Sequence, residues 1–165
     1  MKWLKHLGWA VLAIAILMIV EGGALKSIFA VGDIPHINFA ALERNSKPNQ
    51  FVVCPPGLCP AKVDVDSPTF EVNVERLETV WHEIASSEPR VELADKDDAR
   101  HLRNYVQRAA IMRYPDIITV QFMPDKGGGS TLAIYSRSIY GYSDFGVNKR
   151  RVTNWLAKLQ SKLAT

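Results

Sequence analysis

The spacing of apolar side chains follows a helical period in two stretches of the chain. In the first stretch apolar residues recur every three or four positions, which predicts an amphipathic helix over 74–87 with Asn73 as its N-cap. In the second stretch the same period predicts a helix over 148–163 with Asn148 as its N-cap. The apolar faces consist of Val74, Leu77, Val80, Trp81 and Ile84 in the first helix and of Val152, Trp155, Leu156, Leu159 and Leu163 in the second.

Five other stretches favour strands, because their apolar and polar residues tend to alternate. They are Thr69–Val72, Arg90–Leu93, Asn104–Arg113, Ile117–Met123 and Thr131–Ile139. Strands that follow one another through short connections pair antiparallel, and a Gly-rich hairpin loop over 124–129 joins the last two. The predicted order is therefore β-α-β-β-β-β-α, an α+β domain with both helices on one face of an antiparallel sheet. This order is similar to the TATA-binding-protein-like fold, and a helix-grip fold is the alternative.

A continuous apolar run over 7–20 precedes these elements. As a helix it spans roughly 21 Å, which is less than the ~30 Å hydrocarbon core of a bilayer. Residues 1–24 are therefore either a transmembrane helix that Trp3 and Leu4 extend, or a signal segment cleaved near Gly22-Gly23-Ala24. Residues 25–47 show no sustained period and predict a tether, and residues 48–165 form the folded domain.

Both interpretations export the domain. Lys2 and Lys5 precede the apolar run, so the positive-inside rule keeps the N-terminus in the cytoplasm. In a bacterium the C-terminal domain then lies in the periplasm, and with an uncleaved helix, which we expect, the chain is a single-pass inner-membrane protein. Cys54 and Cys59 lie in an oxidising compartment and flank a Pro-Pro-Gly-Leu turn, which predicts a disulfide. A metal site is the weaker alternative, because closed zinc sites take four ligands.

Charge is unevenly distributed along the chain, whose formal net charge is +3. Residues 136–165 contain six Lys or Arg and one Asp, whereas residues 31–135 contain 11 Lys or Arg and 15 Asp or Glu. A basic C-terminal end suits an anionic partner, and we expect membrane lipid or an envelope protein. Nucleic acid is not an expected partner of a nearly neutral, exported domain. Alternatively, the basic end only balances the acidic middle of the domain.

Three cations, Lys149, Arg150 and Arg151, directly follow Asn148. The first turn of a helix is already positive, so each exposed cation there costs roughly 0.3–1 kcal/mol. We therefore expect this corner to bind a phosphate, a lipid headgroup or a partner's carboxylate through backbone N–H groups and arginines. The candidate ligand-binding residues are Arg137, Ser138, Ser143, Asp144, Asn148, Arg150 and Arg151. In the alternative, the polar residues only cap the helix while the cations point into water.

The same region carries an extended motif. It consists of Ser136-Arg137-Ser138, then Gly141-x-Ser143-Asp144-Phe145-Gly146-Val147-Asn148-x-x-Arg151-Val152, then Trp155-Leu156. This motif resembles the C-terminal signature of a bacterial family of unknown function, DUF1499. Other landmarks of that family are similar to Pro48-Asn49, Arg108, Arg113-Tyr114-Pro115-Asp116 and the hairpin Gly-Gly-Ser-Thr. The resemblance covers about residues 48–160 and implies membrane association, but no activity or ligand. Tyr140 departs from the family pattern, which often has a basic or small residue before the Gly-x-Ser-Asp, and Tyr142 occupies the variable position of that motif.

Complete catalytic signatures are not found in the sequence. The glycine after Ser143 comes one position too late for a nucleophile elbow. His82-Glu83 begins a zinc-helix motif, but Ser86 stands where the second histidine is required. We therefore expect no catalytic residue, metal or cofactor. The alternatives to a binding module are an envelope enzyme that uses Ser143, Asp144 or His101, and a small-ligand carrier with a closed pocket between sheet and helices.

Overall fold

The computed structural model describes residues 6, 8–9, 11–13, 16 and 29–164. It divides into two units, Met1–Gly32 and Asp33–Thr165, and the account below concerns the second. The transmembrane or signal segment predicted over 1–24 lies almost entirely outside the described residues. Within the described part of the chain, none of the helices is both long enough and apolar enough to cross a bilayer.

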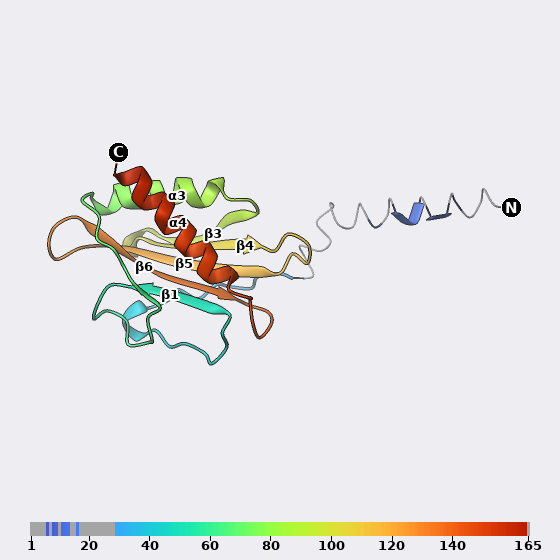
Figure 1. Ribbon diagram of the computed structural model, residues 1–165, viewed down its shortest axis with the longest axis horizontal. Helices are drawn as coiled ribbons and strands as arrows, with labels where there is room; N and C mark the ends of the chain where they lie inside the picture. Colours follow the sequence, from blue (N-terminus) through green and yellow to red (C-terminus); the bar gives the residue numbers. More distant parts are fainter. Residues whose placement is uncertain (1–5, 7, 10, 14–15, 17–28, 165) are drawn as a thin grey trace. The chain divides into compact units, whose positions relative to one another are not determined.

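The domain is an α+β fold built on a six-stranded mixed sheet (Figure 1). The strand order across the sheet is β2-β1-β6-β5-β4-β3, and all neighbours pair antiparallel except β1 and β2, which are parallel. The strands are β1 (Gln50–Cys54), β2 (Val65–Asp66), β3 (Val91–Asp97), β4 (Leu102–Arg108), β5 (Pro115–Pro124) and β6 (Ser130–Ser138). The helices are α3 (Val74–Ser87) and α4 (Val147–Leu163), with short 3-10 turns η1 (Phe39–Ala41) and η2 (Asp98–Arg100).

The predicted strand list needs three corrections. Neither β1 nor β2 was predicted, and the strand expected over Thr69–Val72 is only a bridge between Phe70 and Ser130. The sheet is mixed rather than antiparallel, because β2 joins β1 in parallel. All five residues of β1 are buried, since both faces of this strand are covered. Such a strand lacks the alternation that marks a half-exposed one.

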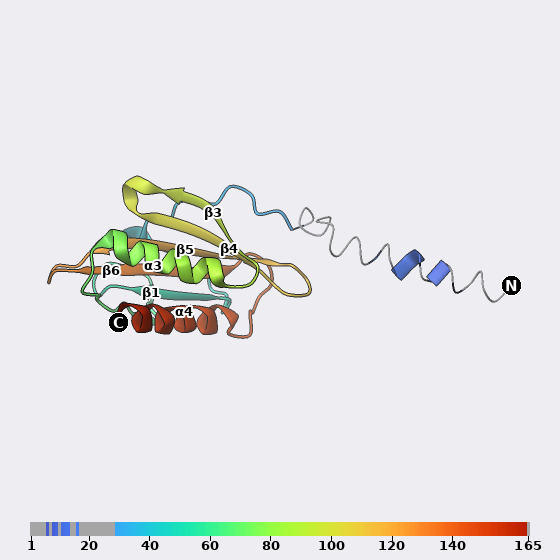
Figure 2. The same ribbon diagram turned by 90° about the horizontal axis from the view of Figure 1, so that it is seen from above.

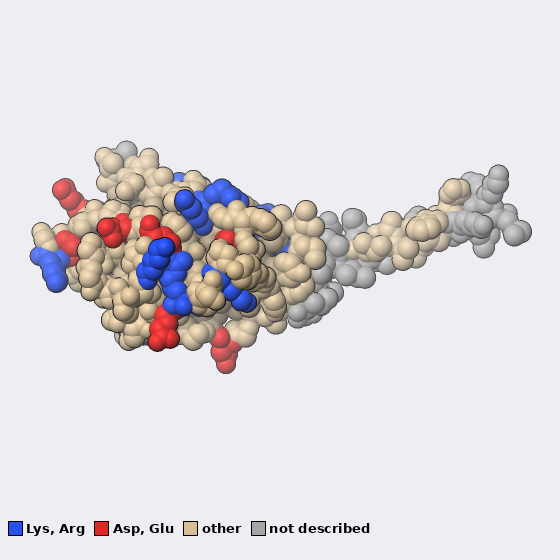
Figure 3. Space-filling model, turned by 60° about the horizontal axis from the view of Figure 1, so that its bottom comes forward, with Lys and Arg blue, Asp and Glu red and all other residues tan. Residues whose placement is uncertain are grey.

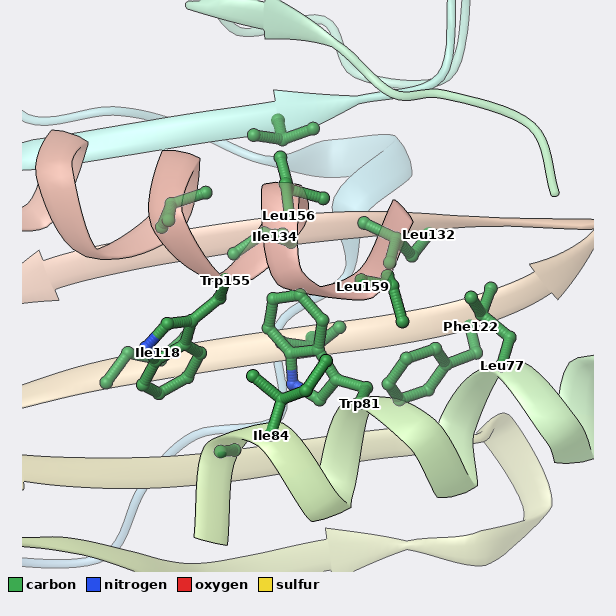
Figure 4. Close-up of a cluster of buried hydrophobic side chains, with 14 of the residues drawn as sticks. Leu77, Trp81, Ile84, Ile118, Phe122, Leu132, Ile134, Trp155, Leu156 and Leu159 are labelled. Carbon is green, nitrogen blue, oxygen red and sulfur yellow. The ribbon is translucent and has the colours of Figure 1, made fainter. Parts of the chain in front are cut away.

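Both predicted helices are confirmed, and both cover one face of the sheet (Figure 2). Their apolar faces meet the sheet in a core centred on Trp81 of α3 and Trp155 of α4, whose ring centroids lie 5.6 Å apart (Figure 4). Ile118 and Phe122 of β5 close this core from the sheet. Because these side chains fill the space between sheet and helices, that layer does not supply the closed pocket that a small-ligand carrier would need.

A second apolar cluster covers the opposite face of the sheet. Phe39 and Leu42 pack there against Val52, Ala133 and Tyr135. Part of the stretch expected to be a tether therefore belongs to the folded domain. The predicted disulfide is confirmed, since Cys54 in β1 is bonded to Cys59 in the loop that follows, with 6.2 Å between their Cα atoms.

Two loops meet at one end of the sheet and position the candidate site. One loop, 109–114, joins β4 to β5, and the other, 139–146, joins β6 to α4 (Figures 1 and 2). They are neighbours because β5 and β6 pair antiparallel, so that Asp116 lies opposite Ser138. The rings of Tyr114 and Tyr140 lie 5.8 Å apart across the two loops.

Candidate functional site

Asp144 caps the start of α4. Its Oδ1 accepts the N–H of Gly146 at 3.0 Å, and its Oδ2 accepts the N–H of Asn148 at 2.7 Å. A carboxylate is the residue of choice here, because it satisfies free N–H groups and complements the positive end of the helix. The expectation that Asn148 is the N-cap is wrong, since the helix begins at Val147 after Gly146.

Asn148 instead lies buried in the first turn of α4, between helix and sheet. Its Nδ2 donates to the backbone oxygen of Asn49 at 3.1 Å, to Ser138 Oγ at 3.1 Å and to Asp144 Oδ2 at 2.8 Å. Its Oδ1 accepts from Ser136 Oγ at 2.5 Å. One amide thus ties α4 to β6 and to the residue before β1, which fixes the helix start against the sheet.

Arg151 lies one turn further along α4 and reaches across three strands. Its Nη2 forms an ion pair with Asp116 of β5 at 2.5 Å, and its Nη1 donates to Ser136 of β6 at 3.1 Å. Its Nε donates to Gln107 of β4. The side chain of Arg151 is 6% exposed and that of Asp116 is 15% exposed. This guanidinium is therefore held by protein groups, which favours a structural role for it over ligand binding.

The three successive cations of α4 have different surroundings. Arg151 is balanced by Asp116, and the N–H groups ahead of it are balanced by Asp144. Lys149 and Arg150 are exposed, and Arg150 donates to the backbone oxygen of Phe145 at 2.8 Å. The anion that the sequence led us to expect at this corner is thus partly supplied by two carboxylates of the chain itself.

Arg137 does not join this corner, contrary to expectation. Successive side chains of a strand point to opposite faces, so Ser136 and Ser138 face α4 while Arg137 faces the other side of the sheet. There its Nη1 donates to Thr119 Oγ1 at 3.2 Å, and its guanidinium lies 4.7 Å from the centre of the Tyr135 ring. Burial lowers the pKa of the Arg137 guanidinium below its usual value.

Next to Arg151 a pocket of about 500 Å³ opens between the two loops. Its charged walls come from Arg90, Arg108, Arg151, Asp116 and Asp144. Its apolar walls come from Ala109, Ala110, Tyr114, Tyr140, Phe145 and Val147, and Gln107, Ser138 and Ser143 complete it. Three arginines face two aspartates, and both aspartates are engaged by Arg151 or by the start of α4. The pocket therefore combines an apolar lining with an excess of positive charge.

Several residues of this site were not among the predicted ones. Asn49, Gln107, Asp116 and Ser136 all contact Asn148 or Arg151. Three of them, Asn49, Asp116 and Ser136, belong to the motif and landmarks that resemble DUF1499, and this was the one signal that pointed to them. Asn49 is 1% exposed, and no described residue donates to its Oδ1.

The enzyme alternative gains no support from His101. This histidine contacts Glu78 of α3 through Nδ1 at 2.9 Å, and neither Ser143 nor Asp144 is among its contacts in the described structure. Ser143 Oγ accepts the N–H of Phe145 at 3.2 Å, so it stabilises the turn. Among the described residues no group of three or more His, Cys, Asp or Glu is arranged to hold a metal ion.

Charges on the domain surface are mixed rather than segregated. On the face drawn in Figure 3, lysines and arginines alternate with aspartates and glutamates. On this face the uneven charge distribution along the sequence is thus largely evened out by folding.

The residues that meet in this site lie within a stretch of the chain that matches a known family. Residues 44–159 match the family described as "Protein of unknown function (DUF1499)". The chain belongs to the DUF1499 family. The match includes Asn49, Asp116 and the entire motif from Ser136 to Leu156, so the polar cluster that fixes α4 lies within the family domain.

Other comparisons add little to the DUF1499 assignment. No curated protein matches the chain. A solved structure of a protein from Nitrosospira multiformis is similar at 14% sequence identity and a TM-score of 0.44, covering 59% of this chain and 93% of that one. Nothing about function follows from this likeness.

Proposed function

We propose that this DUF1499 chain is a membrane-anchored, periplasm-facing module that binds an anionic, partly apolar ligand in the pocket between loops 109–114 and 139–146. One observation carries the proposal: three arginines line the pocket and its two aspartates are already engaged. Arg108 also lies 3.8 Å from Glu92 of β3, whereas Arg90 donates to the backbone oxygen of Arg108 and forms no ion pair within the described part of the chain. An anion entering this pocket gains charge-assisted hydrogen bonds. The volume of about 500 Å³ lies within the range of small-molecule sites, roughly 300–1,000 Å³.

The apolar lining sets the chemical class of the ligand. Tyr114, Tyr140 and Phe145 flank the charged floor of the pocket, so a bare inorganic ion would leave them exposed to water. A headgroup attached to a hydrocarbon chain satisfies both parts of the site, because its charge meets the arginines and its chain covers the rings. An anionic lipid therefore fits better than free phosphate.

Binding is tested with the detergent-purified full chain and three probes: short-chain phosphatidylglycerol, short-chain phosphatidylcholine and inorganic phosphate. We expect phosphatidylglycerol to bind at least about tenfold more tightly than the other two. Arg90→Glu should weaken that binding by at least about tenfold. Lys126→Glu makes the same change of charge in the β5–β6 hairpin at the other end of the sheet and should have no effect. Equal binding of both lipids, or equal effects of both variants, contradicts the proposal.

The membrane and compartment part of the proposal has separate support. The sequence has an apolar run over 7–20 preceded by two lysines, and the Cys54–Cys59 disulfide suits an oxidising compartment. A reporter that fluoresces only in the cytoplasm, fused to Thr165, should stay dark in bacterial cells. Fluorescence from this fusion would refute the periplasmic location. The mass of the purified chain distinguishes an uncleaved anchor from a cleaved signal segment.

A further inference from the structure

Exposed apolar side chains gather at one end of the domain. Within residues 33–164, ten large apolar residues are exposed, and eight of them belong to the two loops or their first flanking residue. These eight are Ile111, Met112, Tyr114, Ile139, Tyr140, Tyr142, Phe145 and Val147, which we call the apolar tips. The other two, Val65 and Leu93, lie elsewhere on the sheet. Single exposed apolar residues are ordinary, but a cluster of this size marks an interaction surface.

The backbone holds the most exposed of these side chains outward. Phe145 is 88% exposed and has a φ of +52°, in the left-handed region that non-glycine residues rarely adopt. Its N–H is bound by Ser143 Oγ and its carbonyl oxygen by Arg150. The turn is thus fixed by hydrogen bonds on both sides of a large apolar ring that gains no packing within the domain. A strained residue held in this way points to a function of the ring itself.

Basic side chains surround the apolar tips. Arg113 belongs to loop 109–114, Arg90 lines the pocket beside that loop, and Lys149 and Arg150 follow loop 139–146. Four carboxylates of the described residues lie in the same region. Asp116 is bound to Arg151 and Asp144 to the start of α4, while Glu92 lies 3.8 Å from Arg108 and Glu88 is paired with Lys158. The rim of the apolar tips therefore presents positive charge to its surroundings.

We propose that the apolar tips dock into the headgroup region of an anionic bilayer. Tyrosine and phenylalanine rings are suited to that region, and flanking Lys and Arg side chains are attracted by anionic headgroups. The positive rim favours such a surface over a second copy of the chain, because two copies would bring their rims together. The inference rests on the proposed function in one respect, namely that an anionic lipid lies at this end of the domain.

Spin labels on the full chain in proteoliposomes test this docking. Single cysteines replace Ile111 and Phe145 at the tips, and Val65 and Leu93 as exposed control positions outside them. The samples contain no reductant, so that the Cys54–Cys59 disulfide remains. Accessibility to oxygen relative to a water-soluble nickel chelate measures depth. In vesicles containing phosphatidylglycerol, the labels at 111 and 145 should show a several-fold higher ratio than those at 65 and 93. Equal ratios at all four positions would overturn the docking.

Charge and self-association are tested in the same samples. Lys149→Glu should reduce the oxygen-to-nickel ratio at position 145, whereas Lys126→Glu should not. The ratio at position 145 should also be lower in pure phosphatidylcholine vesicles than in vesicles containing phosphatidylglycerol. Dipolar broadening between labels at position 145 that persists on dilution with lipid would indicate a second copy at the tips and refute the proposal. The two proposals can fail separately. If short-chain lipid does not bind in detergent but the labels at 111 and 145 lie deep in the vesicle bilayer, the pocket function is rejected and the docking stands.

Discussion

A single guanidinium, that of Arg151, connects α4 to β4, β5 and β6. Both Arg151 and Asp116 are largely buried. The cost of desolvating two charges therefore reduces the net contribution of this ion pair to the free energy of unfolding. The cost appears in full when one partner is lost, because the other charge stays buried without compensation. The residue is thus required for stability even where the pair itself adds little.

We therefore predict that Arg151→Ala lowers the free energy of unfolding by about 3–5 kcal/mol. The neighbouring Arg150→Ala, which removes an exposed cation, should lower it by less than about 1 kcal/mol. Urea unfolding of the detergent-solubilised full chain, followed by near-UV circular dichroism, measures both. Similar losses in the two variants would mean that Arg151 is not the connection described above.

Tyr105 gives the core a dependence on alkaline pH. Its ring is fully buried and its hydroxyl contacts His82 Nδ1 at 3.2 Å. Burial raises the pKa of Tyr105 above its ordinary value near 10. The unfolded chain then loses this proton above about pH 10 while the folded chain keeps it, so stability falls as pH rises, by up to about 1.4 kcal/mol per pH unit.

The prediction is that Tyr105→Phe flattens the loss of stability above about pH 10. Below that pH the variant should be less stable than the native chain by about 1 kcal/mol, since one hydrogen bond is missing. Unfolding midpoints measured from pH 8 to pH 11 provide the test. Tyr142→Phe, which changes an exposed tyrosine, is the control, and identical curves for the two variants would contradict the assignment to Tyr105.

Arg137 shows which part of the site was within reach of sequence reasoning. Alternation along β6 puts Ser136 and Ser138 on the face toward α4 and Arg137 on the other, and a stricter use of that period would have separated Arg137 from Arg151. Periodicity could not assign Asn49, Gln107 and Asp116 to this site. They come from distant parts of the chain, and only the register of the sheet brings them to α4.

At the scale of elements, periodicity predicted the helices that bury only one face and missed strand β1, which is buried on both faces. The helices α3 and α4 show one apolar face each, and both were predicted within one residue of their ends. Strand β1 has the helices on one side and the Phe39–Leu42 segment on the other. Its apolar run therefore carries no period, and this strand was not predicted.

The disulfide acts on this same element. Cys54 ends β1 and is fully buried in the second apolar cluster, and its bond to Cys59 restricts the loop that leads to β2. A closed loop this short should contribute about 2 kcal/mol through the entropy of the unfolded chain.

We predict that Cys54→Ala combined with Cys59→Ala lowers the free energy of unfolding by about 2 kcal/mol or more, because a buried sulfur is also removed. Chemical denaturation of the double variant and of the native chain, with and without dithiothreitol, measures this. Dithiothreitol should affect only the native chain. An unchanged stability of the double variant would show that the β1–β2 connection does not depend on the bond.

At the scale of the whole molecule, the sheet is covered on both faces, by helices on one and by an extended segment on the other. Phe39 is 1% exposed and Leu42 is 4% exposed. Burial of a large apolar side chain is worth roughly 1.5–3 kcal/mol, so the two together make up a large part of the 5–15 kcal/mol that stabilises an ordinary domain.

A fragment that begins at residue 48 should consequently be much less stable than one that begins at residue 33. The shorter fragment leaves Val52, Ala133 and Tyr135 uncovered and should lose roughly 3–6 kcal/mol. Soluble yield and thermal unfolding of both fragments test the prediction. Phe39→Ala in the longer fragment serves as an intermediate case. Equal stability of the two fragments would mean that the segment before residue 48 lies on the sheet without holding it.

The two outer strands of the sheet limit how the protein meets other chains. Strand β2 is two residues long, and β3 carries Glu92, Asp95, Lys96 and Asp97 together with an irregular register next to Leu93. A short edge strand and a charged, bulged edge strand both resist the addition of a strand from another chain. Pairing of the β-augmentation type, and with it amyloid-like stacking of copies, is accordingly disfavoured. Recognition by this domain is left to side chains on its loops rather than to its backbone.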